Sequence, residues 1–159
     1  MKLLRETIRN IISESVDESV DSIKGFIASP ECKMEGTWGN SFNPLIGYEV
    51  SFGDECPVYF KLEPWGGNTI YINSLTIANP DDPSHYDEAC EGKGHATRAM
   101  EALLDHADRN DTTLILEPQA FNHSGEGKRR PNDDVLEGWY SRLGFEWSRQ
   151  DNDTMEYTP

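Results

Sequence analysis

The chain has 159 residues, 36% of them hydrophobic and 10% aromatic, which is enough for one domain with a hydrophobic core and excludes wholesale disorder. Its 29 acidic and 14 basic residues give a formal net charge of −15, which repels nucleic acid and anionic membranes, so neither is expected as a partner. The same charge favours a cationic partner, such as an amine, a polyamine or a basic peptide, although solubility or adaptation to salt explains it without any partner.

The N-terminal segment, residues 1–24, is predicted to form an amphipathic helix, either the first helix of the fold or a separable leader. It resembles the leader of various tailed-phage proteins, and Ile12-Ser13-Glu14 resembles a prohead-protease cleavage site, which implies association with a phage capsid. A helix packed on the domain is the favoured interpretation. Its apolar positions are Leu4, Ile8, Ile11 or Ile12, Val16, Val20 and Ile23.

Three strands are predicted in the first half of the chain. Residues 28–44 are rich in turn formers and are expected to form an irregular connection. The strand-like runs that follow are separated by Gly-Asp and Gly-Gly-Asn, which indicates an antiparallel meander. These runs are residues 46–52, 57–63 and 69–77.

The second half alternates helices and strands. After a long polar loop over 78–94, an apolar stripe of helical period predicts a helix over 94–109, followed by a buried strand over 112–118. Another polar loop, 119–132, leads to a short helix over 133–143, and the segments FEWSR and TMEYT are expected to pair as a closing hairpin. The order predicts an α/β or α+β fold with a mixed, largely antiparallel sheet flanked by helices. We divide it into an N-terminal helix, 1–27, and a domain over 28–159.

A glycine-flanked lysine precedes the helix over 94–109. Gly92 and Gly94 allow a tight turn with exposed amides at the positive end of the helix dipole, which is a natural site for a phosphate group. The ordinary start of a helix after a loop fits the same residues. A dinucleotide fingerprint fits worse, because Thr97 stands where its third glycine would be.

Two motifs resemble the GNAT superfamily of acyl-CoA-dependent N-acyltransferases. The family's pyrophosphate loop, Gln/Arg-x-x-Gly-x-Gly/Ala, is similar to residues 91–96, and its Tyr-x-x-x-Gly-Phe signature is similar to residues 140–145. Both occur in the expected order and elements, and the resemblance covers residues 45–158. It implies a GNAT-like domain that uses acetyl-CoA as cosubstrate and needs no metal.

The resemblance also implies which residues hold the coenzyme. The pyrophosphate would be bound by the amides of Gly92, Lys93, Gly94, His95, Ala96 and Thr97, and the pantetheine arm by the backbone of Leu75, Thr76 and Ile77. Glu91 stands where the family has Gln or Arg, and its charge opposes a pyrophosphate. Lys93, Arg98 and the basic cluster at 128–130 are candidates to offset it.

The implied reaction is transfer of an acetyl group to a primary amine, on a small molecule or on a peptide or protein, by direct attack in a ternary complex. Tyr140 would be the general acid, and Glu117, at the end of its strand, the general base. A packed tyrosine and an exposed strand-end glutamate are the structural alternatives. Glu91 and the long loop favour the alternative function, a catalytically inactive GNAT-fold binding protein or a virion-associated structural protein.

The three cysteines, Cys32, Cys56 and Cys90, are far apart and include no C-x-x-C pair. Their odd number and spacing favour a reducing compartment and argue against a structural zinc site. His85, Cys90 and His95 lie close in sequence without a recognised ligand pattern, so no metal is expected. No run is apolar enough to span a bilayer and the first residues lack a secretory signal, so we expect a cytoplasmic protein, or a virion-packaged one if a phage encodes it.

Overall fold

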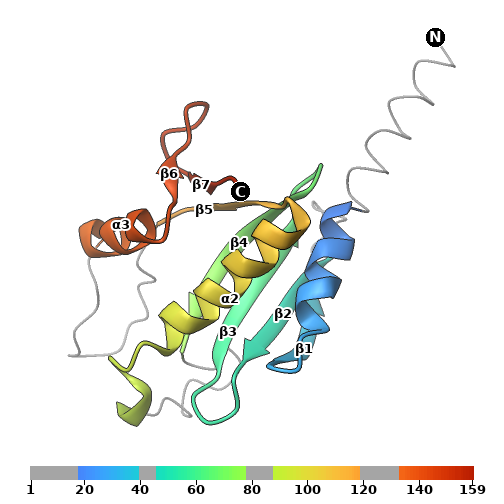
Figure 1. The fold of residues 1–159 in the computed structure, drawn as a ribbon, viewed down its shortest axis with the longest axis vertical. Coiled ribbons are helices and arrows are strands. Elements are labelled where there is room, and N and C mark those ends of the chain that lie inside the picture. Colours follow the sequence, from blue (N-terminus) through green and yellow to red (C-terminus); the bar gives the residue numbers. More distant parts are fainter. Residues whose placement is uncertain (1–17, 40–45, 78–87, 119–132) are drawn as a thin grey trace, which may run out of the picture.

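The computed structural model describes residues 18–39, 46–77, 88–118 and 133–159, and in these it shows a mixed α/β fold built on one seven-stranded sheet (Figure 1). The strand order is β1-β2-β3-β4-β5-β7-β6, and every neighbouring pair is antiparallel except β4 and β5, which are parallel. The strands are β1 Cys32–Trp38, β2 Gly47–Phe52, β3 Val58–Pro64, β4 Thr69–Thr76, β5 Thr113–Leu116, β6 Glu146–Trp147 and β7 Met155–Tyr157. The helices are residues 18–27, the 3-10 helix η2 (Glu88–Cys90), α2 (His95–Asn110) and α3 (Asp133–Arg142).

The predicted order of elements is confirmed over most of the described chain. The meander is β2-β3-β4, the two predicted helices are α2 and α3, and the closing hairpin is β6-β7. These elements carry clear periodicity, alternating in the strands and helical in α2, so the local pattern was sufficient to predict them.

The expectation of an irregular connection over 28–44 is wrong, because β1 forms within it and pairs antiparallel with β2. β1 lies at the edge of the sheet, and its register shifts between Met34 and Gly36. Its side chains are mostly exposed, so it lacks the alternation that marks a half-buried strand. Backbone pairing with β2 stabilises it, and no local pattern signals such pairing.

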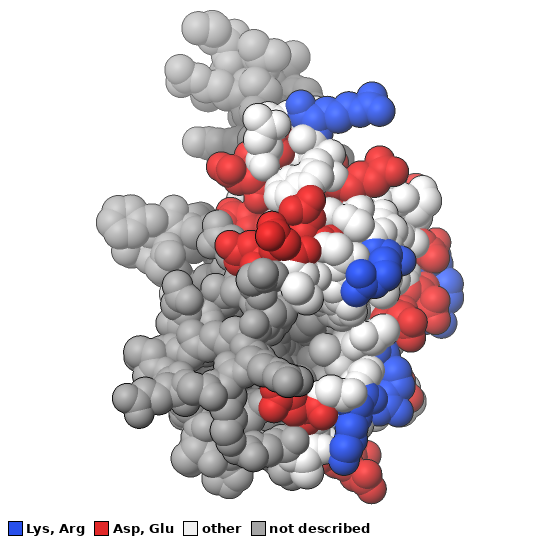
Figure 2. Space-filling view, turned by 90° about the vertical axis from the view of Figure 1, so that its left-hand side faces the viewer, with Lys and Arg blue, Asp and Glu red and all other residues white. Residues whose placement is uncertain are grey.

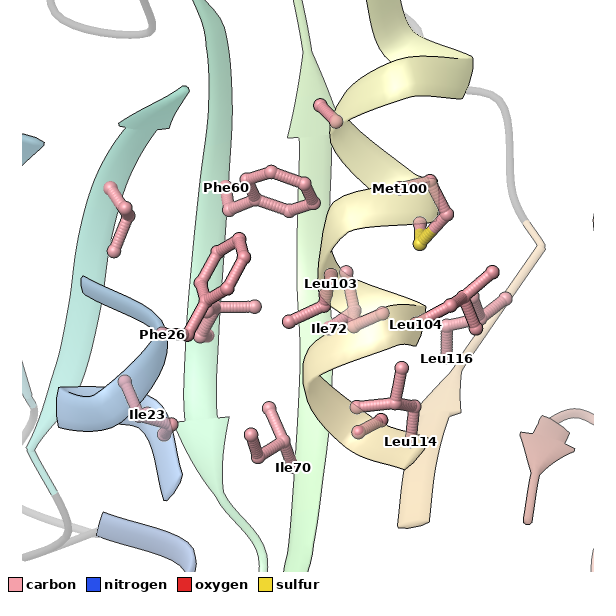
Figure 3. Packing of buried hydrophobic residues seen from close by; sticks show 14 of the residues in the cluster. Ile23, Phe26, Phe60, Ile70, Ile72, Met100, Leu103, Leu104, Leu114 and Leu116 are labelled. Carbon is pink, nitrogen blue, oxygen red and sulfur yellow. The ribbon is translucent and has the colours of Figure 1, made fainter. Parts of the chain in front are cut away.

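The hydrophobic core lies between the sheet and two helices, residues 18–27 and α2, which run side by side over the same face (Figure 1). Phe26 packs edge-on against Phe60 of β3, with ring centroids 5.9 Å apart, and stacks on Phe52 of β2. Leu103 of α2 lies beside Ile72 of β4 in the same core (Figure 3). The described part of the N-terminal helix is therefore a structural layer of the core, while Ile12-Ser13-Glu14 lies outside the described residues.

A buried polar network fastens this helix to α2 and to the residue before β5. His106 of α2 donates from Nε2 to the Ser22 carbonyl oxygen at 2.8 Å, and the Ser22 and Thr112 hydroxyls are 2.8 Å apart. Burial lowers the pKa of His106, an effect that the bond to the Ser22 carbonyl partly offsets. The carbonyl oxygen can only accept a hydrogen bond, so the neutral imidazole carries its proton on Nε2 and donates it to Ser22.

Of the helices described, none combines the length and apolarity that crossing a bilayer requires.

Replacing Phe26 by Ala should lower the free energy of unfolding by about 3–4 kcal/mol, because it removes a buried ring from a packed core. Lys24→Ala, on the exposed side of the same helix, is the matched control and should change it by less than about 0.5 kcal/mol. Denaturant unfolding followed by circular dichroism measures both. Equal effects of the two substitutions would mean that the helix does not contribute to the core.

Candidate functional site

The turn before α2 has the backbone that the sequence predicts. Gly92 and Gly94 have φ of 71° and 77°, in the left-handed region that favours glycine. Both are exposed, and a Cβ built on either would meet no atom of the described residues within 4 Å. Gly94 is the N-cap of α2 and receives no side-chain cap hydrogen bond, and the first turn of α2 contains no acidic residue. The amides at the start of α2 are therefore accessible to an anion from outside the chain.

Two cations lie at this turn. Arg98 donates from Nη2 to Nδ1 of His95 at 2.6 Å, which places its guanidinium beside the first turn of α2. Lys93 and Glu91 are both exposed, so water screens the charge of each. The basic cluster at 128–130 and His85 lie outside the described residues.

The sheet opens next to this turn. The parallel ladder between β4 and β5 joins Thr69–Ile72 to Thr113–Leu116 and ends there, while β4 continues to Thr76 along β3. The register of β4 on β3 shifts just beyond Ile72. Because α2 connects two parallel strands, it begins at the end of the sheet where the carboxyl end of β4 lies (Figure 1). Ligands of α/β sheets bind there, beyond the carboxyl ends of neighbouring parallel strands.

The residues predicted to hold the pantetheine arm lie at this carboxyl end. Leu75 and Thr76 close β4, and Ile77 follows them. Leu75 and Ile77 are half-buried and pack against the core, so their side chains fix the position of this backbone.

Tyr140, the predicted general acid, lies in α3 and is 8% exposed. Its ring packs edge-on against Phe145, with centroids 5.7 Å apart. No described residue hydrogen-bonds to its hydroxyl, and burial raises its pKa to about 12. The adjacent Trp139 donates from Nε1 to the Thr97 hydroxyl at 3.1 Å, which connects α3 to the first turn of α2. The phenol thus stays protonated at neutral pH, as a proton donor must be.

Glu117, the predicted base, directly follows β5 and is exposed. Its carboxylate accepts a hydrogen bond from the Tyr71 hydroxyl, and burial, the charge of Glu117 and this bond together raise the pKa of Tyr71 to about 12. Trp65 stacks on Tyr71 at 4.9 Å and is 54% exposed. Among the described residues no hydrogen bond or ion pair joins Glu117 to Tyr140, so the structure anchors the two candidates separately.

Glu63 is a further candidate for the functional site, and the sequence pattern does not single it out. It is 7% exposed, lies beside Tyr71 in the β3-β4 register, and accepts a hydrogen bond from Nδ2 of Asn73 at 3.2 Å. Burial raises its pKa, and the bond from Asn73 partly offsets this. The alternation of strand 57–63 places Glu63 on the polar face, but only the three-dimensional packing reveals its burial.

The cysteines differ from what the sequence favours. Cys56 and Cys90 form a disulfide, and Cys32 is free. Cys56 and Cys90 are separated by 34 residues in the sequence. They meet because the β2-β3 loop and η2 lie at the same end of the sheet (Figure 1). A disulfide is typical of an oxidising environment, contrary to the reducing compartment that the cysteine spacing favours. In the parts of the chain described, no group of three or more His, Cys, Asp or Glu is arranged to hold a metal ion.

A surface hollow of about 430 Å³ lies elsewhere, beside the closing hairpin. It is lined by Gly144, Glu146, Trp147, Ser148, Arg149, Gln150, Glu156 and Thr158, and includes none of the predicted site residues.

No protein-family model and no curated protein matches the chain. Among solved structures, the crystal structure of the anti-CRISPR protein AcrVA5 matches with a TM-score of 0.39 and 12% sequence identity. The match covers 70% of this chain and 90% of that chain. A TM-score this low supports no conclusion about the fold or the function of this protein.

The raised pKa of Tyr140 predicts an alkaline titration step that Tyr140→Phe removes. A phenol whose pKa rises on folding stabilises the fold fully below pH 10.0, its ordinary value, and that contribution is lost as pH approaches 12. The loss amounts to roughly 2–3 kcal/mol for a shift of this size. Phenolate absorbance after a stopped-flow pH jump measures the step before the chain unfolds. If Tyr140→Phe instead removes a titration step near pH 10, the Tyr140 hydroxyl is in contact with water and its pKa is not raised by burial.

Proposed function

We propose that the protein is an acetyl-CoA-dependent N-acetyltransferase that acetylates a primary amine on a small molecule or on a basic peptide or protein. The observation that carries the proposal is the open turn at Gly92 and Gly94, at the start of α2 and at the edge where the β4-β5 ladder ends. Exposed amides, a positive helix end and the nearby Arg98 are the groups that a pyrophosphate requires. This proposal includes membership in the GNAT superfamily, on the motifs at 91–96 and 140–145.

In the proposed binding mode, the amides from Gly92 to Thr97 hold the pyrophosphate of acetyl-CoA. The pantetheine arm then runs along the backbone of Leu75 to Ile77, with the thioester at the end of the β4-β5 ladder. The hydrogen bond from Trp139 to Thr97 joins α3 to the first turn of α2, and this link supports our proposal that Tyr140, the next residue, serves the departing sulfur.

The proposed reaction begins when the acceptor ammonium loses a proton to Glu117, directly or through water. The neutral amine attacks the thioester carbonyl, the nitrogen of the tetrahedral intermediate loses a proton to water, and the intermediate collapses with cleavage of the carbon–sulfur bond. The leaving thiolate takes the proton of the Tyr140 hydroxyl, which solvent then restores. The products are the N-acetylated amine, coenzyme A and one proton.

The acceptor is proposed to approach from the polar face of the sheet. There the negative charges of Glu63, Glu117 and Asp151 help to raise the pKa of the Tyr71 hydroxyl. The exposed ring of Trp65 stacks on Tyr71. Carboxylates and aromatic faces both attract ammonium groups. The net charge of the chain favours the same class of acceptor.

Glu91 favours the alternative, an inactive binding or virion-associated protein, because a carboxylate at this position opposes a pyrophosphate. We propose the enzyme because Glu91 is exposed to water and Arg98 lies within the adjacent helical turn. A cytoplasmic location is part of the proposal, and the reducing cytoplasm would expose the Cys56–Cys90 bond to thiol reductants.

Calorimetric titration with acetyl-CoA and with coenzyme A should show micromolar binding to the wild type. Gly94→Trp should weaken it by at least about 100-fold, because an indole would occupy the open space over the turn. Gly66→Trp is the matched control: Gly66 also has a positive φ and open surroundings, but lies in the β3-β4 turn at the other end of β4. Absence of binding to the wild type would overturn the proposal.

Once an acceptor amine has been found by screening, Tyr140→Phe and Glu117→Gln should each lower kcat about 100-fold and leave the Kd for acetyl-CoA unchanged. Glu101→Gln, an exposed change on α2, should leave kcat unchanged. Steady-state kinetics paired with calorimetry separates the two effects. If kcat survives both site substitutions, neither residue has the proposed role, whatever the coenzyme affinity.

A further inference from the structure

The Cys56–Cys90 disulfide lies directly beside the glycine turn. Cys90 is the last residue of η2, and Gly92 follows two positions later, within about 7 Å along the chain. Its partner Cys56 lies in the β2-β3 loop, and the two Cα atoms are 5.6 Å apart. The β2-β3 loop, η2 and the start of α2 lie at the same end of the sheet (Figure 1). The bond therefore links the segment leading into the turn covalently to the sheet.

The sheet side of this link is firmly held. Phe52 and Val58 pair across the base of the β2-β3 loop, and Val58 is 1% exposed. The Gly53 amide donates to the Glu31 carbonyl at 2.9 Å, which attaches the loop to the residue preceding β1. Cys56 thus belongs to a fixed part of the fold, and Cys90 itself is 8% exposed.

We propose that the Cys56–Cys90 bond is a redox-sensitive tether that holds the Gly92–Gly94 turn in its binding conformation, so that reduction weakens the binding of a coenzyme pyrophosphate. The second half of this inference rests on the proposed function. An exposed, glycine-rich turn has high conformational freedom, and a ligand must pay to order it on binding. The disulfide removes part of that freedom before the ligand arrives, and its reduction restores it.

The chemistry is exchange with a dithiol reductant. One reductant thiolate attacks a sulfur of the bond, forms a mixed disulfide and releases the other cysteine as a thiolate, which takes a proton. The second reductant thiol then displaces the remaining cysteine, so that the protein gains two electrons and two protons and the reductant becomes a disulfide. Cys32 takes little part, because burial, together with the charge of Glu31, raises its pKa to about 11.

Hydrogen exchange tests the tether without any ligand. The amide of Arg98, which donates to the Gly94 carbonyl at 3.0 Å and so reports whether the turn is formed, should exchange about tenfold faster after treatment with dithiothreitol. Cys56→Ser, which cuts the bond without changing the turn, should show the fast exchange with or without reductant, and Cys32→Ser should behave as the wild type. Thiol counting under denaturing conditions should find one free thiol before reduction and three after it. Unchanged exchange, or three thiols in the oxidised protein, would overturn the tether.

Calorimetry with acetyl-CoA on the same four samples tests the consequence. Reduced wild type and Cys56→Ser should bind about tenfold more weakly than oxidised wild type and Cys32→Ser. Faster exchange with equal affinity in both redox states would overturn the redox control of binding. Faster exchange with no binding in either state would instead refute the proposed function and leave the tether established.

Discussion

The parallel pairing of β4 with β5 is the constraint from which the rest of the arrangement follows. Parallel neighbours cannot be joined by a tight turn, so the chain must cross over one face of the sheet, and α2 forms that crossover. The crossover brings the N-terminus of α2 to the edge where β4 ends. In this way the strand pairing determines where the bare amides lie, and the hydrophobic stripe of α2 holds them there.

Charged side chains of both signs lie on the surface. Figure 2 shows several groups of acidic side chains on the face that it draws, with basic side chains in smaller separate groups between them. A chain with net charge −15 repels anions at long range, but at physiological ionic strength that repulsion decays within about 8 Å. Binding of an anion would therefore depend on groups in direct contact with it, such as amides and Arg98. The same net charge attracts an approaching amine, and salt limits that attraction to the same short range.

Local pattern predicts much of this protein because most of its elements carry their own signal. Alternation predicts β2 to β4, helical period predicts α2, and the glycines predict the turn because few other residues adopt a positive φ. β1 escaped prediction because pairing with β2, and not burial, stabilises it. The Cys56–Cys90 bond and the burial of Glu63 also escaped, because each depends on segments that meet only in three dimensions. Sequence motifs thus locate the candidate residues, while their protonation and their partners require the fold.

The network between Ser22, His106 and Thr112 has a consequence for biosynthesis. Its hydrogen bonds join residues 84 and 90 positions apart, and Phe26, one turn after Ser22, packs on a strand that is synthesised later. A ribosome that has released only the residues before β3 therefore presents a helix whose packing partners on β3 and α2 have not yet been synthesised. Contacts of such long range slow folding and make it cooperative. Until His106 and Thr112 have emerged from the exit tunnel, Ser22 lacks the partners that join this helix to the second half of the chain.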